Sequence, residues 1–190
     1  MADDKKGGKI VRENTYILDT NVYGEILIEE NREQIVQNLK ASKGIFIYGI
    51  DVIENELYNA PADIKYRGIF FREALLSLFK TLVDEVTHIT PLTDYLASQY
   101  FKKYKKLETS GRFYKLIKDK RKKYSENDLK TDFEIIAVAS IKGIDIVVSA
   151  DKRTMLSKLA AETYDIVNKL NGLKTPNLVD YFEFRKRYLK

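Results

Sequence analysis

The chain has 190 residues, a formal net charge of +5, one histidine (His88) and no cysteine. This length is typical of one domain with a substantial core. The absence of cysteine excludes disulfides, zinc–thiolate sites and a cysteine nucleophile, and one histidine excludes histidine-rich metal sites. The chain has neither an apolar run as long as a membrane span nor a signal peptide, so we expect a cytoplasmic protein that does not contact membranes.

Predicted strands and helices alternate in the first half of the chain. Residues 1–13 are polar and Gly-rich, which indicates a flexible lead-in, and residues 14–190 are assigned to a single domain. The predicted elements are strands at 16–22 and 43–50, and helices at 22–40, 51–59 and 62–86. The expected core stripe of the helix at 62–86 consists of Ile69, Phe70, Leu75, Leu76, Phe79 and Leu82.

The second half continues the alternation. It contains a short strand at 86–90, a helix from Pro91 to 107, a polar and basic stretch at 108–124, a nearly apolar helix at 131–142, a buried strand at 144–150 and a helix at 152–170. Residues 175–189 close the chain. Gly143 and Gly172 are expected to cap the two helices that precede them.

This order of elements predicts an α/β fold in which a parallel sheet is covered by helices on both faces. Residues 61–125 would be a mostly helical elaboration of that core. In such sheets the functional site forms at the carboxyl ends of the strands, near the point where the strand order switches.

Acidic residues stand at the ends of the apolar segments. Asp19 follows the first strand, Asp151 follows the strand at 144–150, Asp132 precedes the apolar helix, and Glu54 and Glu56 lie on the short helix after the second strand. Converging carboxylates repel one another unless a divalent cation lies between them. With Mg²⁺ or Mn²⁺, such a cluster can cut phosphodiesters. The simpler interpretation makes each aspartate a helix cap or a turn residue.

Glu54 and Glu56 compete for one role in this cluster. Glu56 is preferred slightly, because it directly precedes the apolar Leu57 and lies to one side of the buried face of its helix. The expected metal ligands are therefore Asp19, Glu56, Asp132 and Asp151. Asp128, four residues before Asp132, is either a helper or a solvated acid of the first helical turn, and we favour the second.

Polar neighbours are expected to support these acids. Thr20 and Asn21 directly follow Asp19 and can hold it in place. Ser149 lies two residues before Asp151, so both side chains can point the same way at the strand end.

Basic residues suggest a polyanionic partner. Lys152 and Arg153 directly follow Asp151 and would hold a scissile phosphate, although both can equally be surface residues. The basic stretches at 101–107 and 114–124 could follow an RNA backbone, with Tyr104, Tyr114 and Tyr124 as stacking platforms. Their alternative interpretation is a solvated helix face.

At these residues the chain resembles the PIN-domain ribonucleases, including the VapC toxins of toxin–antitoxin pairs. The matching pieces are YILDTNV, the acid in VIENEL, DFEIIAVASIKGIDIVVSAD and GLKTPNLVDYFEF. The resemblance implies an RNA-cleaving enzyme that binds one or two Mg²⁺ or Mn²⁺ ions. Its acids would be, in order, Asp19, Glu56 or Glu54, Asp132 and Asp151. Residues 61–125 lie outside the match and make this chain longer than a compact VapC toxin.

The resemblance also implies partners, namely RNA as substrate, a second copy of the chain, and an antitoxin if the role is that of a toxin. The aromatic residues of the predicted helix at 62–86 cannot all face one side, which favours a homodimer. Two rival functions are considered. A PIN-like module that binds RNA or protein would not need mutually repelling carboxylates. A phosphatase-type hydrolase would need a second aspartate two residues after Asp19, where the chain has Asn21.

Overall fold

A computed structural model describes residues 14–110 and 124–188 of the chain. The predicted lead-in at 1–13 and Tyr114 lie outside the described residues. Among the described helices, none is both long enough and apolar enough to cross a membrane.

A five-stranded sheet forms the centre of the molecule. Its strands are β1 (Asn14–Leu18), β2 (Ile45–Ile50), β5 (Glu85–Thr87), β6 (Ile146–Ser149) and β7 (Asn177–Asp180). They lie in the order β5-β2-β1-β6-β7, and every neighbouring pair is parallel. The predicted parallel sheet is confirmed. Continuous burial explains the apolar runs, because helices cover both faces of these strands.

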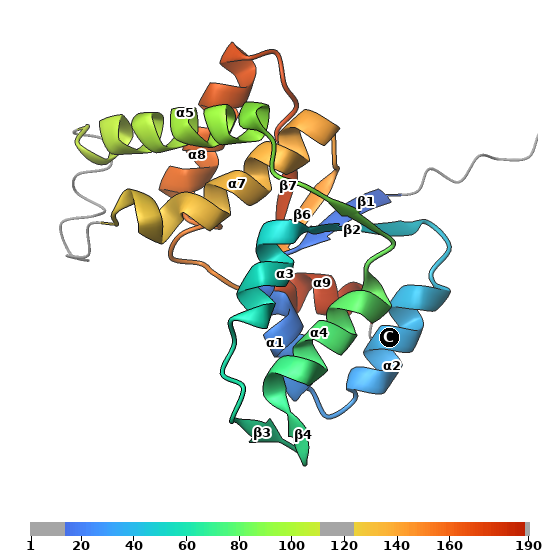
Figure 1. Cartoon of the computed structure of the whole chain (residues 1–190). Coiled ribbons are helices and arrows are strands. Elements are labelled where there is room, and N and C mark those ends of the chain that lie inside the picture. Colours follow the sequence, from blue (N-terminus) through green and yellow to red (C-terminus); the bar gives the residue numbers. More distant parts are fainter. Residues whose placement is uncertain (1–13, 111–123, 189–190) are drawn as a thin grey trace, which may run out of the picture.

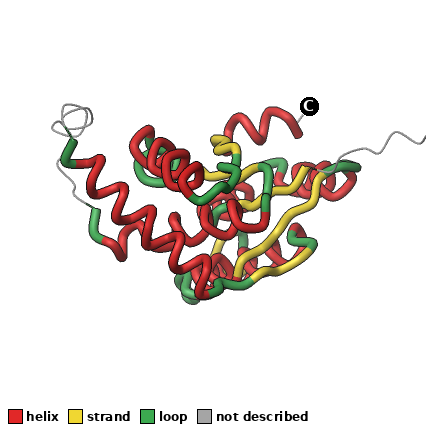
Figure 2. Tube along the Cα trace, turned by 90° about the horizontal axis from the view of Figure 1, so that it is seen from above, coloured by secondary structure: helices red, strands yellow, loops and turns green. Residues whose placement is uncertain are grey.

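Two groups of helices cover the sheet (Figure 1). One group consists of α1 (Thr20–Ile28), α2 (Arg32–Ala41), α3 (Asp51–Tyr58), α4 (Phe71–Leu82) and α9 (Tyr181–Tyr188). The other consists of α5 (Pro91–Glu108), α7 (Glu126–Lys142) and α8 (Lys158–Leu170). Figure 2 shows the strands from above with helices beside them. The predicted α/β fold, with helices on both faces of the sheet, is therefore confirmed.

A buried polar network ties α5 to α7 and α8. The Tyr100 hydroxyl lies 2.5 Å from the Asn168 side-chain oxygen and 3.2 Å from Ser140 Oγ. The Asn168 amide donates to Ser140 Oγ at 3.0 Å. The rings of Tyr100, Phe133 and Tyr164 meet edge to face. Helix α5 is thus part of the core packing rather than a loosely attached addition.

Two of the predicted helices are wrong in the first half of the chain. The helix predicted at 22–40 is divided into α1 and α2, because Glu29 has extended backbone and its carboxylate binds Tyr181 and Arg185 of α9. The start of the helix predicted at 62–86 is a hairpin of β3 (Lys65–Tyr66) and β4 (Ile69–Phe70).

The hairpin also changes the predicted core. Ile69 and Phe70 are exposed, so their assignment to the core stripe is wrong. Leu75, Phe79 and Leu82 are buried as predicted, and Leu76 is half-buried. The hairpin forms because Arg67 and Gly68 both adopt positive φ, of 50° and 83°, which gives the two-residue turn that suits the twist of paired strands.

Helix boundaries differ from prediction around two of the acids. Helix α7 begins at Glu126, with Ser125 as its N-cap in a capping box with Asp128, so Asp132 lies inside the helix and is not its cap. Helix α8 begins at Lys158 rather than at 152, because the Asp151 side chain binds the backbone N–H groups of Arg153 and Thr154 and forms a turn there. Gly143 ends α7 in the left-handed conformation, as predicted.

Candidate metal centre

The candidate site lies where the strand order switches. From β1 the chain builds outward through β2 to β5, and then crosses over to β6 and β7 on the other side of β1. Asp19 follows β1 and Asp151 follows β6, two adjacent parallel strands in which Leu18 pairs with Val148. Glu56 lies on α3, which starts at the carboxyl end of β2. Asp132 lies near the start of α7, which leads back into β6. All four acids therefore approach the same end of the sheet.

Asp19 is held rigidly at the start of α1. Its side chain is 4% exposed and accepts hydrogen bonds from the Thr20 backbone at 2.7 Å, from Ser149 Oγ at 2.7 Å and from the Asn21 amide. Burial raises the pKa of Asp19 to about 6, against the opposing effect of these hydrogen bonds, and the negative charge of Glu56 adds to the rise. Asp19 caps α1, so the simpler structural interpretation is also correct. A helix cap, however, does not require a buried carboxylate or the repulsion of that carboxylate by Glu56.

Asn21 and Ser149 both donate a hydrogen bond to the Asp19 carboxylate. A contact of Asn21 with Asp19 was expected from the sequence, whereas Ser149 was expected beside Asp151. The Asn21 side-chain oxygen accepts the Ala150 backbone N–H at 2.7 Å, which ties the start of α1 to the end of β6. Ser149 Oγ donates to Asp19 and accepts the Asp151 backbone N–H at 3.0 Å. The two strand ends are thus joined through one hydroxyl.

Thr20 contacts two of the acids, whereas a contact with Asp19 alone was predicted. Its backbone binds Asp19, but its hydroxyl donates a short hydrogen bond to a Glu56 carboxylate oxygen. The negative charge of Glu56 acts to raise the pKa of both Asp19 and Asp132. The geometry therefore favours Glu56 over Glu54 as the second acid.

Asp151 is oriented by the turn that follows it. Its carboxylate accepts hydrogen bonds from Arg153 N at 2.7 Å, Thr154 N at 3.1 Å and Thr154 Oγ1 at 2.8 Å. Burial acts to raise the pKa of Asp151, but the hydrogen bonds from Thr154 and Arg153 outweigh it and lower the pKa. Asp151 is consequently the acid best prepared to carry a negative charge.

Asp132 is the most informative of the acids. Its Oδ2 atom is buried and, among the described residues, has no hydrogen-bond partner. Burial raises the pKa of Asp132 to about 7, a hydrogen bond with Thr154 opposes the rise, and the charges of Asp19, Asp151 and Glu56 add to it. A buried carboxylate oxygen without a partner is costly unless a ligand satisfies it.

The residues fit a divalent cation chemically. Mg²⁺ and Mn²⁺ prefer carboxylate oxygens, and the four acids repel one another in the absence of positive charge. Within residues 14–110 and 124–188, no three acidic or imidazole side chains are already close enough to form a ligand set. The carboxylates would therefore have to shift in order to share one ion.

Three residues near the acids were not predicted from the sequence. Thr154 is buried and contacts both Asp151 and Asp132. The hydroxyls of Tyr23 and Tyr164 are buried without a partner in the described part of the chain, and the charge of Asp19 acts on both. The spacing of Thr154 three residues after Asp151 was the available signal. A tyrosine at a core position of a helix gives none.

The two basic residues that follow Asp151 lie in different environments. Lys152 forms an ion pair with Asp180 at 2.9 Å, which places its ammonium group beside β7. Arg153 is exposed, and its backbone supports Asp151. Tyr104 is 4% exposed within the core, so its predicted role as a stacking platform is wrong.

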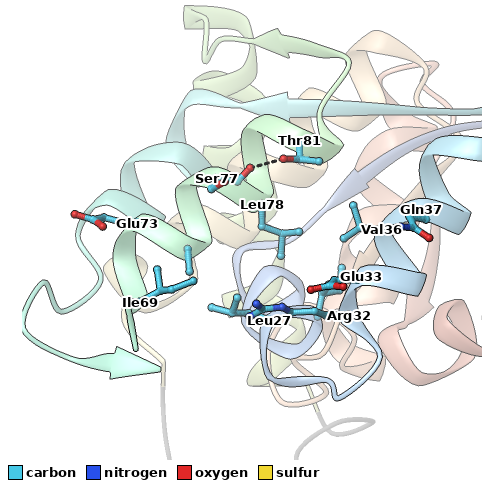
Figure 3. Close-up of a pocket in the computed structure, with 12 residues that line it drawn as sticks. Leu27, Arg32, Glu33, Val36, Gln37, Ile69, Glu73, Ser77, Leu78 and Thr81 are labelled. Carbon is cyan, nitrogen blue, oxygen red and sulfur yellow. Dashed lines mark hydrogen bonds between the residues drawn. The ribbon is translucent and has the colours of Figure 1, made fainter. Parts of the chain in front are cut away.

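A separate groove lies between α1, α2 and α4 (Figure 3). Its volume is about 570 Å³, and its lining includes Leu27, Val36, Ile69 and Leu78 together with the charged Arg32. None of the four candidate ligands lines it. It is therefore distinct from the acidic site.

Comparisons with known proteins find likeness in structure and none in sequence. No family model matches the chain, and no curated protein matches its sequence. Among solved structures, the chain is similar to one from the crystal structure of VapBC2 from Rickettsia felis bound to a DNA fragment from their promoter. The TM-score is 0.44 at 12% identity, over 87% of this chain and 98% of that one. The fold and site described above do not depend on this likeness.

Proposed function

We propose that the protein is a ribonuclease that depends on Mg²⁺ or Mn²⁺ and cuts RNA phosphodiester bonds. The observation that carries this proposal is Asp132, a buried carboxylate whose Oδ2 lacks a partner among the described residues and whose pKa is raised by burial and by the three other acids. A fold that only needed to be stable would not keep such a group unpaired. The resemblance of the acid-bearing segments to PIN-domain ribonucleases supplies the reaction type.

Asp19, Glu56, Asp132 and Asp151 would hold the metal. When bound, a divalent cation of this kind activates water and stabilises the negative charge that develops during phosphodiester hydrolysis. The protein contributes orientation. Asn21 and Ser149 fix Asp19, Thr20 fixes Glu56, and Thr154 fixes Asp151. The absence of cysteine and the exposed position of His88, beside Asp51, fit a reaction without a covalent enzyme intermediate.

The proposal is tested with end-labelled single-stranded RNA. We expect cleavage with Mg²⁺ or Mn²⁺, no cleavage with EDTA, and a higher melting temperature on addition of either metal, because a ligand that binds the folded state stabilises it. RNA binding without cleavage under all metal conditions, and without thermal stabilisation by metal, would contradict the nuclease and favour a binding module.

We also propose that two copies of the chain associate. The sequence argument for this changes, since Ile69 and Phe70 belong to a hairpin and Phe79 is buried. Apolar side chains that are exposed elsewhere, Leu92 of α5 and Leu170 of α8, now support the association. We expect sedimentation equilibrium at micromolar concentration to give twice the 22.1 kDa mass of the chain. A strictly monomeric mass would refute the dimer and leave the nuclease proposal intact.

An antitoxin partner belongs to the same proposal only if the nuclease acts as a toxin. Expression of the wild-type chain would then arrest growth, and the Asp132→Asn variant would not. A small neighbouring gene whose product relieves the arrest is the expected partner.

A further inference from the structure

A second surface with nucleic-acid chemistry begins at the end of α3, the helix that carries Glu56. It comprises residues 58–72, which are the end of α3, the hairpin of β3 and β4, and the start of α4, and it is called the aromatic arm below. Three cations lie over three rings within it. Lys65 Nζ is 4.7 Å from the Phe70 centroid, Arg67 is 5.3 Å from that of Tyr66, and Arg72 is 5.3 Å from that of Tyr58.

These rings are not part of the core. Tyr58 is 60% exposed, Phe70 is exposed, and Tyr66 is half-buried. Exposed aromatic rings on a short two-stranded hairpin contribute little to folding, since a hairpin of this size gains stability mainly from what it packs against. The ring surface is therefore available to a ligand.

The cations are available as well. In the part of the chain that the structure describes, no carboxylate forms an ion pair with Lys65, Arg67 or Arg72. The segment 58–72 contains one acidic residue, Asp63, against these three positive charges. An unneutralised cation beside each exposed ring is the combination that binds a phosphate backbone and stacks its bases.

The arm is connected to the acidic site at one end. Tyr58 is the last residue of α3, the helix that carries Glu56. The Arg72 side chain lies over its ring and is held by a hydrogen bond from Nε to the Ala60 carbonyl at 2.8 Å. At the other end, the Tyr66 hydroxyl donates to the Ile28 carbonyl at the close of α1. Helix α1 itself begins beside Asp19. The arm thus extends from the acids along α1 and beyond it (Figure 1).

Arg67 occupies a position whose backbone conformation favours other residue types. It occupies the left-handed region, with φ of 50°, where asparagine, aspartate or glycine is favoured. Its guanidinium group lies over the Tyr66 ring, and no carboxylate pairs with it among the described residues, so its charge is available to a ligand.

We propose that the aromatic arm binds single-stranded RNA that leads into the acidic site, with bases stacked on Tyr58 and Phe70 and phosphates contacted by Lys65, Arg67 and Arg72. This inference rests on the proposed ribonuclease function. Single-stranded RNA is favoured over duplex RNA because paired bases do not offer their faces to a ring. It is favoured over a protein partner because the segment carries three cations and one acid, Asp63, and none of the three cations is paired with a carboxylate in the described residues, which matches a polyanionic backbone.

Binding is measured in the Asp19→Asn background, which keeps the RNA intact, with a fluorescently labelled 12-nucleotide oligo(U). We expect Tyr58→Ala and Phe70→Ala each to weaken binding by about tenfold, since stacking contributes strongly per base. Tyr58→Phe should retain the affinity. Tyr95→Ala is the matched control, because Tyr95 is also 60% exposed but lies on α5, and it should change nothing. Lys65→Gln should lower the dependence of affinity on salt by about one phosphate contact.

Three outcomes would contradict the binding of single-stranded RNA by the aromatic arm. In the first, the Tyr58→Ala and Phe70→Ala variants bind the oligonucleotide as tightly as the background. In the second, an RNA duplex of equal length binds as tightly as the single strand. In the third, the double variant Tyr58→Ala/Phe70→Ala changes the sedimenting mass and leaves RNA affinity unaltered, which would identify a protein interface.

Substrates of different length separate the test of RNA binding by the arm from the test of RNA cleavage at the acids. With the Asp19 side chain restored, Phe70→Ala should slow cleavage of the 12-nucleotide RNA and leave cleavage of a dinucleotide, which is too short to reach both the acids and Phe70, at the wild-type rate. If no RNA is cut by any variant but Tyr58→Ala still weakens binding, the arm is supported and the ribonuclease proposal fails.

Discussion

Replacing Asp132 or Asp19 by asparagine is expected to reduce RNA cleavage by about a thousandfold. Loss of one carboxylate ligand removes several kcal/mol of charge stabilisation from a metal-assisted reaction, and each 1.4 kcal/mol corresponds to about a factor of ten. Initial rates on labelled RNA at saturating Mg²⁺ or Mn²⁺ measure the effect. Circular dichroism should show that both variants remain folded.

Matched variants test the assignment of the second acid. Glu56→Gln should cost as much as Asp132→Asn, because Glu56 is bound by Thr20 and coupled to Asp19 and Asp132. Glu54→Gln should leave cleavage within about twofold of wild type. The reverse result would assign the second position to Glu54. Wild-type cleavage by either aspartate variant would refute the site.

The metal-free protein is expected to lose stability as the pH rises from about 4 to about 7. In the folded state the pKa of Asp132 is about 7 and that of Asp19 about 6, both above the ordinary value of 3.8, because of burial and repulsion. The folded state then binds protons that the unfolded state has released, so its advantage is present below pH 4 and lost as the pH passes the folded pKa values. The loss amounts to several kcal/mol, since each pH unit between the ordinary and the folded pKa contributes about 1.4 kcal/mol.

Chemical denaturation in EDTA at several pH values between 4.5 and 8 measures this loss. Asp145 and Asp151, whose pKa values are lowered, are already ionised throughout that window and do not contribute to the slope. Asp132→Asn should flatten the slope and stabilise the metal-free protein at pH 7.5, because it removes a buried charge that no hydrogen bond satisfies at Oδ2.

Asp19→Asn should stabilise less than Asp132→Asn. Three donors point at the Asp19 carboxylate, and an amide in its place cannot accept all of their hydrogen bonds. Asp165→Asn serves as the control, since Asp165 is exposed and paired with Lys169, and it should leave the slope unchanged. A stability that rises from pH 5 to 7.5 in EDTA would contradict the buried, repelling cluster.

Local patterns in the sequence were sufficient to predict the parallel sheet and the end of the sheet at which three of the acids lie. The apolar runs before Asp19 and Asp151 predicted β1 and β6, because a strand covered on both faces must be apolar along its length. Parallel strands then placed both carboxylates at one end of the sheet. Asp132 could be attributed to the same end from the order of elements, since its helix leads back into β6.

The hairpin at 65–70 could not be predicted in the same way. Ile69, Phe70 and Phe71 fit the apolar spacing of a helix, and the competing signal was the single pair Arg67-Gly68. The turn formed there needs positive φ at both residues, which an arginine rarely adopts, so residue preferences gave little weight to it. Contact between Tyr66 and the end of α1 helps to fix the hairpin, and such contact depends on residues distant in the chain.

Local residue patterns predict an α/β domain with carboxylates at the ends of its strands, because burial and strand geometry are set by nearby residues. Which of those carboxylates act on one another depends on contacts between elements that are distant in the chain. The preference for Glu56 over Glu54 depends on the Thr20 hydroxyl, 36 residues away. The raised pKa of Asp132 depends on charges from three other elements and on burial between them. Electrostatic coupling of this kind falls off with distance in space and not along the chain, so it exists only once the strands are in order.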